Sequence, residues 1–101
     1  MSVVVTIHVP VGDVAKAIEG LQNNAALLSE ISGSVTDKGM LHHRFVAGDG
    51  ELLVIDEWDS EAQFRAFFDG DQRVGQVMSD AGASGPPTVT IYQSIEAAGT
   101  V

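Results

Sequence analysis

Two adjacent histidines, and a run of acids that ends in the only tryptophan, are the residues of this chain best suited to chemistry. His42 and His43 lie in one apolar segment, and Asp56 and Trp58 lie at the end of the next. Neighbouring side chains point to opposite faces of a strand, so only one of the two histidines can face a given cavity. An imidazole oriented by a carboxylate is a suitable general base for a phenolic proton, because imidazoles titrate near neutral pH.

The turn at residues 48–50 leaves two pairings open for the strands that carry these groups. A three-residue loop with a glycine bulge places His42 opposite Asp56, whereas a two-residue Asp-Gly turn places His43 there. Either way, one imidazole faces the carboxylate, and Trp58 lies two residues further along the same face. The alternative is a cross-strand polar pair that only stabilises the sheet.

Five further side chains are candidates for holding a ligand. Trp58 could stack on a flat aromatic compound or anchor the core. Phe64 and Phe67 have helical spacing, so they either line a pocket or pack on the sheet. Arg44 could hold an anionic oxygen or pair with a surface acid. Tyr92 could donate a hydrogen bond to a carbonyl group or leave its hydroxyl in water.

The sequence predicts no metal site and no bound cofactor. The three histidines, His8, His42 and His43, lack the spacing of known metal-binding motifs. The glycines at 48 and 50 precede a strand rather than a helix, so they do not form a phosphate-binding loop. The chain has no cysteine, which excludes a disulfide framework and a thiol nucleophile.

The length and charge of the chain limit its function further. A chain of 101 residues predicts one domain, residues 1–101. Its net charge of −9 would repel a polyphosphate, so we expect no nucleic-acid partner. No basic leader and no long apolar segment are present, so we expect a cytoplasmic protein without a membrane partner.

The pattern of apolar residues predicts an α+β domain. β-Branched and alternating segments predict strands, and repeats at three and four residues predict helices. Asp13 and Ser60 are the expected N-caps of the two helical regions. The predicted elements are strand 3–9, a helix from 13 to 31 that ends at 32–34, strands 40–47 and 51–58, a helix from 61 interrupted at 69–70 and continuing to 81, and strand 88–95.

This β-α-β-β-α-β order is typical of a ferredoxin-like fold with a four-stranded antiparallel sheet. The segments Val3-Val4-Val5 and Leu52-Leu53-Val54-Ile55 carry apolar side chains on both faces of that sheet. Two helical regions can cover only one face. The sequence therefore predicts a homodimer joined through the open sheet faces.

The densest set of characteristic motifs runs from residue 40 to residue 87, and the junction Glu57-Trp58-Asp59-Ser60 is its most specific part. With these motifs the chain resembles the antibiotic biosynthesis monooxygenase family, within the dimeric α/β-barrel (ferredoxin-like) superfamily. The motifs are His42-His43-Arg44-Phe45, Gly48-Asp49-Gly50, Asp56-Glu57-Trp58-Asp59-Ser60, Phe64, Phe67-Phe68, Ala81-Gly82 and Pro86-Pro87.

The resemblance implies two chemistries: cofactor-independent oxygenation of a phenol or quinol, and haem degradation. The haem-degrading relatives combine an Asn on the first strand, a Trp at the end of the third and a His on the last helix. Trp58 matches the Trp, but the first strand offers Ile7 or His8 and no Asn, and residues 71–81 contain no His. The resemblance therefore favours the cofactor-independent oxygenases.

The leading hypothesis is a dimeric, cofactor-independent monooxygenase that acts on a small planar aromatic, quinol-like compound. Its pocket would lie between sheet and helices, with His42 or His43 as base beside Asp56. The expected pocket residues are Trp58, Phe64, Phe67 and Tyr92, with Arg44 as a further ligand contact. The alternative is a non-catalytic, ligand-binding protein of the same dimeric fold.

Overall fold

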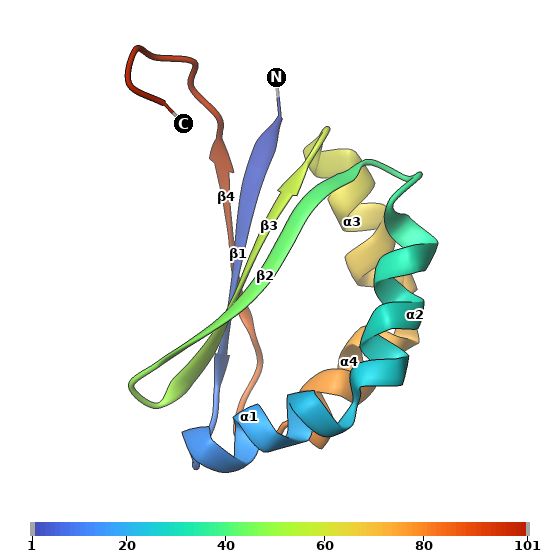
Figure 1. Cartoon of the computed structure of the whole chain (residues 1–101), viewed down its shortest axis with the longest axis vertical. Helices are drawn as coiled ribbons and strands as arrows, with labels where there is room; N and C mark the ends of the chain where they lie inside the picture. Colours follow the sequence, from blue (N-terminus) through green and yellow to red (C-terminus); the bar gives the residue numbers. More distant parts are fainter. Residues whose placement is uncertain (1, 101) are drawn as a thin grey trace.

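The structure, a computed structural model, describes residues 2–100, and the predicted α+β class is confirmed. Within these residues, four strands alternate with two pairs of helices (Figure 1). The elements are β1 (Val3–Pro10), α1 (Val14–Asn23), α2 (Ala25–Val35), β2 (Met40–Gly48), β3 (Glu51–Trp58), α3 (Glu61–Gly70), α4 (Gln72–Asp80) and β4 (Thr88–Gln93). In this part of the chain, no helix has both the length and the hydropathy needed to cross a membrane.

The strands form one antiparallel sheet in the order β2-β3-β1-β4, as the ferredoxin-like prediction requires. Figure 1 shows the helices gathered on one side of this sheet, with the other side left open. The two helical regions therefore shield one face, and β2 and β4 are the edge strands. Any site between sheet and helices must use the side chains on the covered face.

The first predicted helical region is in fact two helices, and the second is divided where the sequence predicted an interruption, at the end of α3. The first breaks at Asn24, whose N–H group donates to the carbonyl oxygen of Leu21 at 3.1 Å and whose carbonyl accepts from Leu28 at 2.9 Å. The predicted end at residues 32–34 is wrong, because α2 continues to Val35. There Ser34 donates to the carbonyl of Ile31 at 2.7 Å, which lets serine remain inside a helix.

Glycine is a poor helix former, and packing explains its presence at position 20 inside α1. A Cβ atom at this position would lie 2.8 Å from the carbonyl oxygen of Asp80, at the end of α4. Such a distance is a steric overlap, so only glycine lets α1 approach α4 so closely. Gly20 thus lowers the helix propensity of α1 but allows the two helix pairs to come into contact.

The predicted N-caps are confirmed. The Asp13 side chain accepts a hydrogen bond from the N–H of Lys16 at 3.1 Å at the start of α1. Ser60 accepts from the N–H of Gln63 at 3.3 Å and donates to the side chain of Gln63 at 2.8 Å. Each cap satisfies an N–H group that the first turn of a helix leaves without a partner, and so fixes where the helix begins.

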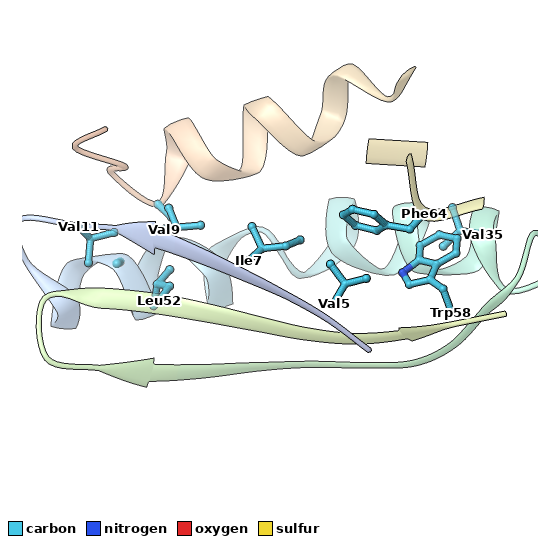
Figure 2. Close-up of a cluster of buried hydrophobic side chains, with 10 residues drawn as sticks. Val5, Ile7, Val9, Val11, Val35, Leu52, Trp58 and Phe64 are labelled. Atoms are coloured by element: carbon cyan, nitrogen blue, oxygen red, sulfur yellow. The ribbon is translucent and has the colours of Figure 1, made fainter. Parts of the chain in front are cut away.

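The hydrophobic core lies between the covered sheet face and the helices (Figure 2). Alternate residues of β1 point into it, and Val5, Trp58 and Phe64 are fully buried. The ring of Trp58 packs edge-on against Phe64 at 5.9 Å and stacks on Phe67 at 5.5 Å between centroids. This aromatic cluster anchors α3 to the end of β3.

The hairpin register decides between the two alternatives left open by the sequence. Gly48 pairs with Glu51, so the loop has two residues and His43 lies opposite Asp56. Gly50 alone supplies the positive φ of the turn, at 71°. Further along, the register shifts by one residue between Met40 and His42, a β-bulge that the sequence does not signal.

An ion pair fixes the junction between α3 and α4. The Asp71 side chain caps α4 by accepting from the N–H of Arg73 at 3.0 Å, and it accepts from the Arg73 guanidinium at 2.6 Å. Arg73 also donates to the Ser34 hydroxyl of α2 at 3.0 Å. The guanidinium hydrogen bonds lower the pKa of Asp71, although burial opposes them. The same pair raises the pKa of Arg73.

We expect Asp71→Asn to lower the free energy of unfolding most at about pH 7. Asn remains a good N-cap, so the variant isolates the loss of charge. A carboxyl whose pKa is lowered on folding stabilises the native state above its ordinary pKa, and that contribution disappears as pH falls through the lowered value. The difference from the wild type, measured by urea unfolding, should therefore shrink towards about pH 3. A difference independent of pH would contradict this account.

Candidate functional site

The site is built around Asp56, a buried carboxyl on the covered face of β3. Its residue is only 3% exposed. His43, on the neighbouring strand, places Nδ1 2.6 Å from Oδ1 of Asp56. Trp58, two residues along β3, donates from Nε1 to Oδ2 at 3.2 Å. Both carboxyl oxygens thus have partners, as burial of such a group requires.

These contacts leave His43 with one free ring nitrogen. An ionised carboxylate only accepts hydrogen bonds, so in that state of Asp56 the donor of the short contact is Nδ1 of His43. In the neutral form of that imidazole, Nε2 carries a lone pair that can accept a proton from a ligand. The side chain is 29% exposed and touches the Phe45 ring edge-on at 4.7 Å, so the imidazole is held on two sides and still accessible.

His43 and Asp56 line a small apolar cavity between the sheet and helices α2, α3 and α4. The cavity volume is about 80 Å³. Its other walls are aliphatic and aromatic, and they come from both the sheet and the helices. The lining residues are Ile7, Val9, Leu28, Ile31, His43, Phe45, Val54, Asp56, Phe67, Phe68, Val74, Val77 and Met78. A polar pair at the end of an apolar chamber is typical of sites for small molecules.

Three of the eight predicted site residues line this cavity: His43, Asp56 and Phe67. Trp58 and Phe64 do not line it, contrary to the expectation from the sequence. Both are fully buried in the aromatic cluster, so neither ring face is free to stack on a ligand. Trp58 instead acts on the site through its hydrogen bond to Asp56.

His42, Arg44 and Tyr92 lie on the opposite, open face of the sheet, so they do not line the cavity. The reason is strand alternation: His42 pairs with Glu57, and Tyr92 pairs with Val4, both of which point away from the helices. The side chain of His42 is 81% exposed, and Tyr92 is 54% exposed. The expectation that Tyr92 would line the pocket is therefore wrong, and Arg44, expected as a further ligand contact, does not line the cavity either.

Several lining residues were not recognised as site residues from the sequence. Phe45 alternates with His43 along β2, and that alternation could have indicated it once the register was known. Val74, Val77 and Met78 form one face of α4, but their spacing indicates burial without indicating a cavity. Among residues 2–100, no group of three or more potential metal ligands comes together.

No known protein family matches the sequence, and no curated protein matches it significantly. Solved structures do match. A monooxygenase from the ActVA-Orf6 gene of Streptomyces coelicolor, solved in complex with nanaomycin D, shares 22% identity at a TM-score of 0.72, over 95% of this chain and 89% of that one. SnoaB, a cofactor-independent oxygenase from Streptomyces nogalater, shares 13% identity at a TM-score of 0.62, over 98% and 97%.

The chain has the fold of these monooxygenases. A dimeric ferredoxin-like protein from an uncultured marine organism also matches, with 8% identity and a TM-score of 0.70 over 95% of this chain and 90% of that one. At such identities the similarity establishes the fold and nothing finer. The shared architecture agrees with the resemblance seen in the Glu57-Trp58-Asp59-Ser60 junction.

We expect Trp58→Phe to lower the free energy of unfolding by about 1–3 kcal/mol. The phenyl ring keeps most of the packing with Phe67, but Oδ2 of Asp56 loses its donor and stays buried. Trp58 is the only tryptophan, so unfolding should be followed by circular dichroism rather than by fluorescence. An unchanged stability would mean that water reaches Asp56 readily, which would contradict the buried pairing described above.

Proposed function

We propose that this protein is a cofactor-independent monooxygenase that acts on a small planar aromatic compound with a phenol or quinol hydroxyl. The observation that carries the proposal is the His43–Asp56 pair at 2.6 Å, set in an otherwise apolar cavity. An electron-rich phenol or quinol becomes a better electron donor to dioxygen once its hydroxyl is deprotonated, so a base is the group that this reaction needs from the protein. The fold shared with the oxygenase SnoaB supports the same reaction type.

His43 is the general base of the proposed reaction. Its Nε2 takes the phenolic proton, and Asp56 stabilises the imidazolium that forms. The phenolate then gives electrons to dioxygen, and a bond forms between a ring carbon and one oxygen atom. The other oxygen leaves as water, using the proton held by His43 and the hydrogen displaced from the ring carbon. The products are a quinone and one water molecule, so dioxygen is the only oxidant needed.

The apolar cavity walls contribute in two ways. They exclude water, which strengthens the interaction between His43 and Asp56 and protects a reactive anion from side reactions. Phe45 and Phe67, on opposite walls, offer ring surfaces to a planar compound. Both effects favour an aromatic substrate over a flexible polar one.

We also propose that the protein forms a homodimer through its open sheet face. Apolar side chains, including Val4, Leu53 and Ile55, lie on that face with no helix over them. A second copy would cover them by packing sheet on sheet. The dimeric ferredoxin-like protein of the same fold supports this arrangement.

The decisive experiment compares His43→Ala with His42→Ala during oxygen uptake from a panel of hydroquinones in air. The two residues are adjacent, but only His43 lines the cavity, which makes His42→Ala a matched control. We expect His43→Ala to lose about 100-fold or more in rate, because a positioned general base contributes at least that much. His42→Ala should stay within about twofold of the wild type.

Two outcomes would overturn the proposal. If no hydroquinone gives oxygen uptake above buffer, the protein does not oxygenate this class, and the non-catalytic ligand-binding alternative takes its place. If both variants react as fast as the wild type, His43 is not the base. A loss confined to His43→Ala, with its circular dichroism spectrum unchanged, would support the assignment.

For the dimer, we expect light scattering with gel filtration to give a mass of two chains at micromolar concentration. Val4→Glu places a charge on the open face, where its cross-strand neighbours are Glu57 and Tyr92 and offer no cation, and it should yield monomers because an unpaired buried charge is costly. Ala62→Glu adds the same charge to the exposed surface of α3 and should remain dimeric. A monomeric wild-type protein would contradict the proposed assembly.

A further inference from the structure

We infer that the substrate is an elongated, uncharged aromatic compound whose apolar extension lies in a groove beside strand β2. This inference rests on the proposed function and names the substrate class of the same site. The groove, called here the β2 groove, runs between helices α1 and α2 and the hairpin end of β2, and has a volume of about 440 Å³. Its principal walls are Ile18, Leu21, Ala25, Leu28, Phe45 and Ala47.

The cavity at His43 is too small to hold the whole of such a substrate. Its volume of about 80 Å³ is below the roughly 150 Å³ of an apolar cavity that accommodates benzene. Even a single aromatic ring that reaches His43 must therefore lie partly outside the cavity, and a substituted or fused compound must extend further beyond it. Two neighbouring spaces could hold the part of the substrate that lies outside the cavity.

The β2 groove adjoins the cavity. Leu28 and Phe45 line both spaces, so the wall between them includes these two side chains, and a turn of the Phe45 ring would join the groove to the cavity. Phe45 lies two residues from His43 on the same face of β2, a distance of about 7 Å along the strand. Because β2 is an edge strand, the groove opens to solvent at that edge of the sheet. A ring at His43 can thus continue along the strand towards Ala47.

The opposite side of the cavity is less suitable. There Phe67 separates the cavity from a second space, of about 500 Å³, that Lys38, Asp71 and Arg73 also line. The Phe67 ring stacks on Trp58 at 5.5 Å, which holds this wall in place. Phe45 has no comparable stacking partner among the described aromatic pairs; its contact is the edge-on one with His43.

The lining of the β2 groove defines the chemistry of the extension. Gln22 is the only polar residue in its lining within the described part of the chain, and the other eight are apolar. No charged group there could balance a carboxylate or phosphate on the ligand. Burial of an unpaired charge is costly, so the extension should be an alkyl chain or a further fused ring.

The test measures binding apart from turnover, with 2-alkyl-1,4-naphthoquinones from methyl to octyl as probes. These quinones carry no phenolic proton, so they report binding only. Quenching of the fluorescence of Trp58, the only tryptophan, reports occupation of the cavity. We expect the dissociation constant of the wild type to fall about fourfold for each methylene group that enters the groove.

Ala25→Phe and Ala26→Phe form a matched pair for this experiment. Both alanines are exposed at the start of α2, but only Ala25 lines the β2 groove. Ala25→Phe should fill the groove, weaken octyl binding by about tenfold or more, and leave methyl binding within about twofold. Ala26→Phe should bind the whole series as the wild type does.

The outcomes separate this inference from the proposed oxygenation. Chain-length dependence that Ala25→Phe abolishes, without oxygen uptake from the reduced quinols, would support the groove and overturn the oxygenase. Oxygen uptake with affinities independent of chain length would overturn the groove and leave the oxygenase in place. Chain-length dependence that survives Ala25→Phe, or that both variants weaken equally, would also overturn the groove.

Discussion

The buried carboxyl of Asp56 is the constraint on which the site depends. A carboxyl group that is 3% exposed requires partners, and the structure provides them from two directions, His43 across the strands and Trp58 along the same strand. Each partner is tied in turn to packing: the indole to the aromatic cluster, and the imidazole to Phe45. The geometry of the base is therefore set by the same contacts that join sheet to helices.

That geometry exists only because of the hairpin register. Strand side chains alternate between faces, so a shift of one residue would exchange His43 for His42 and place the imidazole of His43 on the open face. The short turn that ends at Gly50 prevents this shift, since it pairs Gly48 with Glu51. A two-residue loop far from the cavity thus selects which histidine can act as a base.

The sequence predicted the element order, the sheet and both helix caps, because period and capping chemistry are local properties. It predicted the pairing of one histidine with Asp56 but not which one, since both loop lengths satisfy the local preference of Asp49-Gly50. It misplaced Tyr92, whose face follows from the pairing of β4 with the distant β1. The face of Arg44 follows from the same hairpin register that selects between the two histidines. The break at Asn24 falls where the poor helix formers Asn23 and Asn24 predict a bend. The bulge at Leu41 is not signalled, because periodicity alone does not encode a shift of register.

The two faces of the sheet have different roles: the covered face carries the cavity, and the open face carries the proposed dimer contact. The described residues that line the cavity lie on the covered side of the sheet or on the helices over it, whereas the apolar residues proposed to join two chains lie on the open side. Only the backbone of the sheet separates the two surfaces. On β2, His42 lies on the open face and His43 on the covered face, and on β3 their partners Glu57 and Asp56 are divided in the same way. A partner packed on the open face would stiffen β2 and β3 from behind. Such support would hold His43 and Asp56 in register.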